Sequence, residues 1–254
     1  MTRVLATYNI KGGVGKTSAA LNLAYLAASE GARTLLWDLD PQGASTYVFR
    51  IKARVKGGGR KLVRGKSDVE DLIKGTDHER LDLLPADFSY RHMDLALADS
   101  KDPTSRLARV LEPLRDSYDY VFLDCPPSIS LVSEGVFEAA DALLVPIIPA
   151  TLSSRTFEQL RQVVARVDGA APQVLAFLSM VDGRKRLHRE LTASLQADFP
   201  EVMSTGIPSA AEVERMGLER TIIEEFAPRS RAAVAYRELW AEIRARLAAG
   251  APSL

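Results

Sequence analysis

A glycine-rich segment near the N-terminus has the residue types needed to hold phosphate groups. It comprises Lys11, Gly12, Gly13, Val14, Gly15, Lys16 and Thr17. A short apolar run precedes it and a helix-like run follows it, so backbone N–H groups of the turn and of the helix N-terminus would face phosphate oxygens. Lys16 would reach the terminal phosphates, and the Thr17 hydroxyl would take a magnesium ligand position. The segment therefore predicts binding of a nucleoside triphosphate.

The spacing of this segment departs from the general phosphate-loop pattern. That pattern, G-x-x-x-x-G-K-[ST], would place glycine at position 10, where the chain has Ile10. A second lysine, Lys11, opens the loop instead. Phosphate binding alone does not require it, and the loop by itself leaves open whether Lys11 merely adds attraction for phosphate.

Acidic residues follow two further apolar runs. Asp38 and Asp40 end the run before Pro41, and Asp124 ends the run from Tyr118. The carboxyl ends of parallel strands face the ligand crevice of an α/β sheet. Asp38 and Asp124 could serve magnesium or its water ligands, and Asp40 could orient or deprotonate an attacking water. The alternative for each acid is a role in capping or turn formation.

Composition bounds the class of protein. The 254 residues have a formal net charge of zero, so any attraction for nucleic acid must come from local clusters. The single cysteine, Cys125, excludes a disulfide within the chain and a multi-cysteine metal site. Its position beside Asp124 would suit a redox sensor, but we expect a small buried thiol. We also expect no signal peptide, no membrane span and a cytoplasmic location.

Apolar runs alternate with helical patterns along the whole chain. The expected strands are Arg3–Tyr8, Thr34–Trp37, Leu81–Leu84, Tyr120–Leu123, Ala142–Ile148 and Val174–Met180. The expected helices are Ser18–Ser29, Ser105–Asp116, Ser133–Ala140, Arg155–Val167, Arg189–Asp198 and Ala232–Leu247. This alternation predicts a single doubly wound α/β domain over residues 1–254, with a mostly parallel sheet flanked by helices.

A basic insert at about residues 50–67 interrupts this alternation. Residues 50–66 contain eight lysines and arginines, no acid, and three consecutive glycines at 57–59. The pattern predicts a mobile loop or a hairpin with a glycine turn. Two roles stay open for it: a solvated surface loop, or a contact with the phosphate backbone of nucleic acid.

The glycine-rich segment and the two acidic segments at the ends of apolar runs, taken in this order, resemble the motifs of the ParA/MinD family of deviant Walker A ATPases. They are Lys11–Thr17, Asp38–Gly43 and Asp124–Ser128. Weaker matches occur at Leu83–Ala86, Val145–Pro146, Ile148–Pro149, Met180–Arg184, Ile207–Pro208 and Ala227–Arg231. The form of Asp38–Gly43 is most similar to ParA/Soj partition ATPases. The chain departs from that pattern in its longer, more basic insert and in Ala44, where many relatives have a polar residue.

This resemblance implies roles for the site residues. ATP and Mg²⁺ would be the cofactors, and two subunits would sandwich two ATP molecules, with Lys11 reaching the partner's nucleotide. Lys11, Lys16 and Asp40 would act in hydrolysis, Asp40 by positioning water. The metal would be served by Thr17, Asp38 and Asp124. The nucleotide would contact Lys11, Gly12, Gly13, Val14, Gly15, Lys16, Thr17 and Ser18, with Pro208 near the adenine.

The resemblance also implies partners. An ATP-bound homodimer would bind double-stranded DNA non-specifically on the nucleoid, and a ParB-like protein would stimulate hydrolysis, so that plasmid, chromosome or protein cargo is segregated. Candidate DNA contacts are Arg60, Lys61, Arg64, Arg184, Arg186, Arg189, Arg215, Arg220, Arg229 and Arg231. Lys185 belongs to the same C-terminal group of cations.

Two alternatives differ in class. A MinD-like membrane switch would use the amphipathic stripe of Val234, Leu239, Trp240, Ile243 and Leu247, although such stripes usually pack on the domain. A metabolic ATP-dependent enzyme, such as a ligase, would need a dedicated substrate pocket.

Overall fold

The computed structural model describes residues 2–167 and 170–250, and within them eight strands form one sheet. The strands are β1 (Arg3–Thr7), β2 (Thr34–Asp38), β3 (Lys74–Gly75), β4 (Leu81–Leu84), β5 (Tyr120–Asp124), β6 (Ala142–Ile147), β7 (Gln173–Val181) and β8 (Val202–Pro208). Their order is β3-β4-β2-β5-β1-β6-β7-β8, and only β3 pairs antiparallel. The doubly wound, mostly parallel sheet predicted from the sequence is confirmed.

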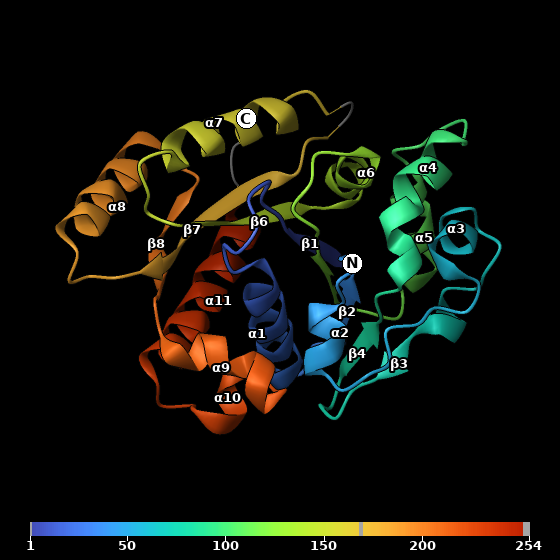
Figure 1. The fold of residues 1–254 in the computed structure, drawn as a ribbon, viewed down its shortest axis with the longest axis horizontal. Helices are drawn as coiled ribbons and strands as arrows, with labels where there is room; N and C mark the ends of the chain where they lie inside the picture. The colour runs from blue at the N-terminus through green and yellow to red at the C-terminus, as the bar shows by residue number, and fades with distance from the viewer. Residues whose placement is uncertain (1, 168–169, 251–254) are drawn as a thin grey trace.

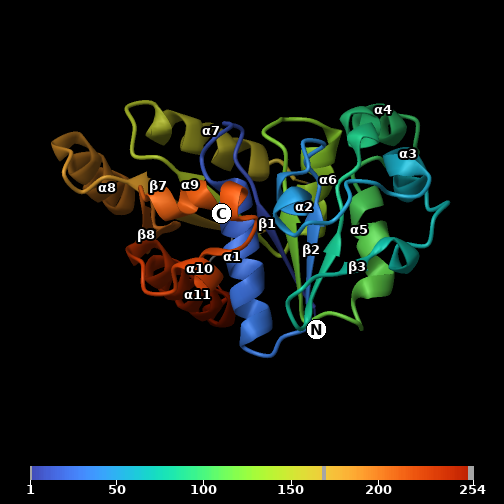
Figure 2. The same cartoon turned by 60° about the horizontal axis from the view of Figure 1, so that its bottom comes forward.

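Helices cover both faces of this sheet (Figures 1 and 2). One face carries α1 (Lys16–Ser29), α2 (Ala44–Val48), α9 (Ala211–Glu219), α10 (Ile223–Phe226) and α11 (Arg231–Ala249). The other carries α3 (Gly58–Val63), α4 (Met93–Ala98), α5 (Arg106–Leu111), α6 (Leu131–Ala139), α7 (Ser153–Val164) and α8 (Arg186–Asp198). Short 3₁₀ turns occur at Glu70–Leu72, Phe88–His92 and Glu112–Leu114.

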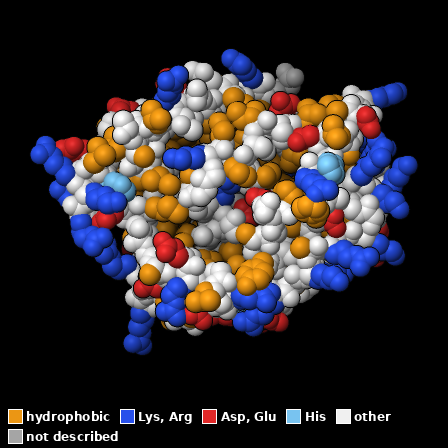
Figure 3. Space-filling model, viewed as in Figure 1, with side chains coloured by type: hydrophobic (Ala, Val, Ile, Leu, Met, Phe, Trp, Pro, Cys, Tyr) orange, Lys and Arg blue, Asp and Glu red, His pale blue; other side chains and the backbone are white. Residues whose placement is uncertain are grey.

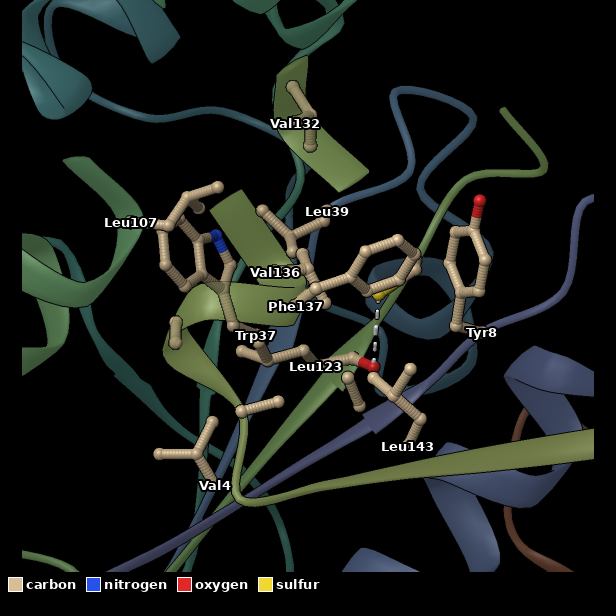
Figure 4. Packing of buried hydrophobic residues seen from close by; sticks show 14 of the residues in the cluster. Val4, Tyr8, Trp37, Leu39, Leu107, Leu123, Val132, Val136, Phe137 and Leu143 are labelled. Atoms are coloured by element: carbon tan, nitrogen blue, oxygen red, sulfur yellow. Dashed lines mark hydrogen bonds between the residues drawn. The ribbon is translucent and has the colours of Figure 1, made fainter. Parts of the chain in front are cut away.

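Alternate side chains of each central strand enter two separate cores. In β2, Trp37 packs with α5 and α6 on one face, where it lies near Leu107 and Phe137 (Figure 4). Its neighbour Leu36 packs on the opposite face, in the core that contains Trp240 of α11. Burial on both faces explains why the strands read as nearly continuous apolar runs.

The predicted strands all occur, and the differences have physical causes. The predicted helix Ser105–Asp116 is divided, because Pro113 lacks the N–H needed to continue α5 and a 3₁₀ turn follows. Strand β8 is not among the predictions, since its Ser204 and Thr205 weaken the apolar signal. Both residues donate backbone N–H groups to Glu242 of α11, which covers the sheet edge.

The basic insert contains a short helix, where the sequence predicts a mobile loop or a hairpin. Residues 58–63 form α3, whose Leu62 and Val63 are buried. The Gly59 N–H donates to Ser89 Oγ (2.8 Å), and a Cβ at position 59 would lie 2.7 Å from the Tyr90 ring. The glycines thus allow close packing of a short helix rather than a flexible turn.

The stripe on the C-terminal helix packs largely on the domain. Leu239, Trp240 and Ile243 are buried, and the Trp240 indole donates to Glu30 of α1's C-terminal end (3.0 Å). Val234, predicted on the same side, is 39% exposed. Among the described residues, no helix is both long and apolar enough to cross a membrane.

A pair of helical glycines tests the close packing of α6 on α5. A Cβ at Gly135 would lie 2.6 Å from the buried Leu107 side chain and 3.0 Å from the Thr104 carbonyl oxygen. We expect Gly135→Ala to lower the free energy of unfolding by about 1–3 kcal/mol, because overpacking outweighs the gain in helix propensity. The control, Gly217→Ala in α9, meets open space and should raise it by about 0.5–1 kcal/mol. Equal stability of both variants in urea denaturation would contradict this account.

Candidate active site

The glycine-rich segment Lys11–Thr17 extends from the loop after β1 into the first turn of α1, in the predicted order of strand, turn and helix. Gly13 and Gly15 have left-handed backbone conformations, with φ of 70° and 96°. A Cβ at Gly15 would also lie 2.9 Å from Ser179 Oγ. No side chain caps the N-terminus of α1, so its first N–H groups lack the partner that a capping residue usually gives. An uncapped helix start beneath a glycine turn can bind an anion.

The two lysines of the segment have different environments. Lys16 is 7% exposed, and its ammonium donates to the Lys11 carbonyl (3.2 Å). Burial lowers the pKa of Lys16, whereas Asp124, Cys125 and Asp40 act to raise it. The Lys11 side chain is exposed, while its backbone N–H donates to Asn9 Oδ1 (2.9 Å). The Lys16 side chain therefore lies inside the protein, whereas the Lys11 side chain is accessible to a group outside the chain.

Asp38 and Asp124 lie at paired positions at the ends of β2 and β5. Both are buried, at 0% and 1% exposed. Burial is the largest cause that raises the pKa of each carboxyl group. The charge of Asp124 raises the pKa of Asp38 further. Two carboxyl groups enclosed together favour either a bound proton or a nearby cation.

Two residues of α2 hold this carboxylate pair. Ser45 Oγ donates to Asp124 Oδ2 (2.8 Å), and Thr46 donates its N–H (2.8 Å) and its hydroxyl (2.7 Å) to Asp38 Oδ2. The sequence interpretation missed Ser45 and Thr46. Their signal is a Ser-Thr pair one residue beyond the Asp-Pro-Gln-Gly turn, where side-chain hydroxyls can reach back to the acids.

The donor set fits magnesium bound together with nucleotide phosphates. Asp124 Oδ1 is buried without a hydrogen-bond partner, which suits an atom directed at a cation or its water. Within residues 2–167 and 170–250 there is no cluster of three or more His, Cys, Asp or Glu side chains that could hold a metal. Mg²⁺ commonly uses one or two carboxylates and completes its shell with phosphates and water. Asp124 and Thr17 are the residues that would hold it, while Asp38 Oδ2 is engaged by Thr46.

Asp40 lies in the turn that follows β2. Its N–H donates to Asp38 Oδ1 (3.3 Å), and its Oδ1 accepts the Gln42 N–H (2.9 Å). The turn closes through the Gly43 N–H and the Asp40 carbonyl. One carboxylate oxygen thus fixes the turn, and the half-buried residue keeps its other oxygen for a further contact.

A small pocket beside Gly15 includes the residue predicted to lie near adenine. Pro208, the last residue of β8, lines it with Ser179 of β7 and Tyr236 of α11. The pocket brings residues that are more than 160 positions away in sequence next to the glycine-rich segment. Ser179 and Tyr236 were missed because strand order, not sequence spacing, places them there.

Comparisons with known proteins identify the family of this chain. A family model described as "AAA domain" matches residues 2–177. The sporulation initiation inhibitor protein Soj of Bacillus subtilis is 32% identical over 251 residues, which cover 96% of this chain and 99% of Soj. The chromosome partitioning protein ParA of Caulobacter vibrioides is 34% identical, covering 78% of this chain and 76% of that protein. The chain belongs to the ParA/MinD family of ATPases.

A solved structure extends the similarity beyond sequence. A Mycobacterium smegmatis protein described as cobyrinic acid a,c-diamide synthase, with a bound ATP analogue and magnesium, superposes with a TM-score of 0.85 and 25% identity. The match covers 100% of this chain and 98% of that one. A protein with this fold therefore binds both a nucleotide and Mg²⁺.

The candidate DNA contacts of this ParA/MinD family member lie in separate parts of the fold. Arg60 and Lys61 lie in α3, and Arg64 directly follows it, near the β3 edge of the sheet (Figure 1). Arg184, Arg186 and Arg189 lie at or just before the start of α8, near the β8 edge, and the remaining cations lie on or beside α9 and α11. Lysines and arginines accordingly gather at both ends of the face in Figure 3. The structure does not bring all the predicted cations into one patch.

Many of these cations have partners within the chain. Arg60 and Arg64 ion-pair with Asp99, Arg184 with Asp182, Arg186 with Glu190, and Arg215 with Glu219. Arg189 donates to the Gly183 carbonyl, and Arg220 to the Tyr47 carbonyl. Lys61, Arg229 and Arg231 are exposed. Exposed ion pairs are weak, so most of these cations can exchange partners for phosphate at small cost.

The raised pKa values of the carboxylate pair predict a pH-dependent stability. A carboxyl group whose folded-state pKa is raised stabilises the folded state at low pH and loses this contribution as the pH rises through the raised value. Asp124→Asn removes one of the two charges. As the pH rises from 4 to 8, the wild-type protein should therefore lose more stability than the variant. The free energy of unfolding of the variant, relative to that of wild type, should increase by about 1–2 kcal/mol over this range.

This shift is measured by urea denaturation in chelator without nucleotide. Comparing two pH values cancels any pH-independent packing effect of the substitution. Asp71→Asn, at an exposed position, is the control and should show no such shift. A constant difference between Asp124→Asn and wild type across this range would contradict the buried-pair interpretation.

Proposed function

We propose that the chain is a Mg²⁺-dependent ATPase that positions cargo through an ATP-dependent dimer cycle on DNA. The observation that carries the proposal is the buried Asp38–Asp124 pair, with Asp124 near Lys16 in the first turn of an uncapped helix, and with Lys11 exposed at the opening of the same loop. The similarity to Soj and to the chromosome partitioning protein ParA of Caulobacter vibrioides supports the cargo-positioning part.

We infer the hydrolysis step from the chain's own residues. The α1 N-terminus and Lys16 would bind the phosphates, and Thr17 with Asp124 would hold the metal. Bound Mg²⁺ would offset the charge of the β- and γ-phosphates. Asp40, whose turn already fixes one carboxylate oxygen, orients the attacking water with the other.

The exposure of Lys11 supports a role across a dimer interface. Its own chain already supplies Lys16 to the phosphates, and the Lys11 backbone is anchored to Asn9 while its side chain extends outward. A second cation from a partner subunit would offset charge that develops during phosphoryl transfer. Dimerisation would then depend on ATP, and hydrolysis on dimerisation.

The cellular part of the proposal rests on relatives. The ATP-bound homodimer would bind double-stranded DNA through the cations near α8 and α11, with the α3 cations as a second contact. A ParB-like protein would stimulate hydrolysis and release. The proposed location is the nucleoid, in the cytoplasm. Burial of Leu239, Trp240 and Ile243 leaves little of the C-terminal stripe for a lipid surface.

Two substitutions separate the roles of the charged groups. We expect Asp40→Ala to dimerise with ATP yet lose about 100-fold in turnover, because the water is no longer oriented. Lys11→Ala should stay monomeric with ATP and turn over little. Light scattering after size exclusion and release of ADP and phosphate, each with and without duplex DNA, measure both properties.

Lys101→Ala, at an exposed position away from the loop, is the matched control and should behave as wild type. Wild-type turnover in Asp40→Ala would end the water-positioning role. Normal dimerisation of Lys11→Ala would end the cross-subunit role. Transfer of phosphate to another substrate, instead of its release, would favour a metabolic enzyme, as the similarity to the Mycobacterium smegmatis synthase allows.

Replacing charged side chains tests the cations near α8 and those near α3 separately for binding to DNA. Changing Arg184, Arg186 and Arg189 to Gln should weaken retention on duplex DNA and reduce the slope of log affinity against log salt by about 2–3, since each phosphate contact contributes about 0.9. Changing Arg60, Lys61 and Arg64 to Gln should also weaken retention and flatten the salt dependence. Retention is measured by co-sedimentation with ATP.

The control for both triple variants changes Arg3, Arg33 and Arg80, which are exposed at other places, to Gln. It should retain wild-type binding. Unchanged retention after neutralising the α3 cations would make the insert a solvated surface. Retention on anionic liposomes instead of DNA would favour the MinD-like alternative.

A further inference from the structure

One guanidinium group joins two elements that flank the candidate site. Arg220 follows the last residue of α9, and its Nε and Nη2 donate to the Tyr47 carbonyl in α2, at 3.1 and 2.9 Å. The same guanidinium lies 4.3 Å from the centre of the Tyr47 ring. Arg50 adds a weaker link from its Nη2 to the Glu219 carbonyl (3.4 Å). We call this set of contacts the Arg220 latch.

At one end the latch holds the helix that carries the carboxylate partners. α2 has only five residues, too few to be stable without tertiary contacts. Ser45 and Thr46, directly before Tyr47, hold Asp124 and Asp38. The Asp40 turn directly precedes this helix. Any movement of the Tyr47 carbonyl therefore shifts the hydroxyl groups that position both acids.

At its other end the latch reaches the pocket beside Gly15. α9 begins at Ala211, and Ala210, Val213 and Glu214 line that pocket together with Pro208. Met216 in the middle of α9 is buried and packs against Asn22 of α1. A single short helix thus extends from the pocket to Arg220.

The backbone at position 220 indicates that the side chain is needed there. Arg220 has φ 52° and ψ 50°, a left-handed conformation that glycine adopts without strain and arginine does not. The contacts of the guanidinium with Tyr47 offset this local strain. They also leave less of the guanidinium for DNA than the exposed Arg229 and Arg231 have.

We propose that Arg220 is a positioning residue for ATP hydrolysis, which couples the pocket beside Gly15 to the Asp38–Asp124 pair through α9 and α2. The inference rests on the proposed ATPase function. It assigns Arg220 to the geometry of the metal and water residues instead of to phosphate contacts with DNA.

Two substitutions at the same position separate positioning from stability and from charge. Arg220→Gly removes the latch and relieves the left-handed backbone, and Arg220→Lys keeps the charge but cannot donate through two adjacent nitrogens. We expect kcat to fall about tenfold in both, because small displacements of catalytic groups are costly. The KM for ATP should stay within about twofold, and the Mg²⁺ concentration for half-maximal rate should rise.

The matched control is Arg237→Ala in α11. Arg237 also donates twice to a backbone carbonyl, that of Pro228, and pairs with Glu224. Among the described residues, no side-chain hydrogen bond or ion pair joins it to α2 or to the pocket residues. It should retain wild-type kcat and Mg²⁺ dependence. Urea denaturation should show Arg220→Gly to be at least as stable as Arg237→Ala, so a lower kcat would not reflect unfolding.

The outcomes are distinguishable. Wild-type kcat and Mg²⁺ dependence in Arg220→Lys would overturn the inference and leave the ATPase proposal intact. Loss of DNA retention in Arg220→Gly with unchanged basal turnover would return Arg220 to the DNA contacts and also overturn it. If the wild-type chain releases no phosphate from ATP, the proposed function fails first and the inference fails with it.

Discussion

Asp38 and Asp124 lie side by side at the ends of adjacent strands, and neither carboxyl group reaches solvent. Burial and mutual repulsion oppose the ionised form of both, so hydrogen bonds from Ser45 and Thr46 and the charge of Lys16 are needed to stabilise it. These three residues come from two elements, α1 and α2. The pair therefore requires the phosphate loop, the β2–α2 turn and the β2–β5 register to form together.

The same requirement explains why the site suits a cation that binds together with phosphate groups. Asp40 and Asp124 lie near the buried ammonium of Lys16, and Asp38 is paired with Asp124, so acidic groups outnumber basic ones at the site. Asp124 Oδ1, which is buried without a hydrogen-bond partner, would face a divalent ion or its water. Because the described residues supply few oxygen ligands, phosphates and water would complete the shell of that ion.

Much of this arrangement was predictable because it depends on short-range patterns. The strand, glycine turn and helix around Lys11–Thr17 are contiguous, and acids at strand ends share one sheet edge in any parallel sheet. Position across the sheet was not predictable. The separation of the α3 cations from those of α8 depends on strand order, which places β3 and β8 at opposite edges.

The basic insert shows a second limit of sequence reasoning. Its eight cations and three glycines dominated the interpretation, whereas Val55, Leu62 and Val63, which are buried, determine its structure. A few apolar residues at helical spacing were enough to fold it against the 3₁₀ turn that contains Ser89 and Tyr90. Charge density alone did not reveal whether the segment was ordered.

The division of side chains between the two faces of the sheet has an optical consequence. The chain has two tryptophans, and Trp37 belongs to one core while Trp240 belongs to the other. Replacing either one leaves a single fluorophore on a known side of the sheet. The emission of the remaining indole would then show which helical layer loosens first, without any attached dye.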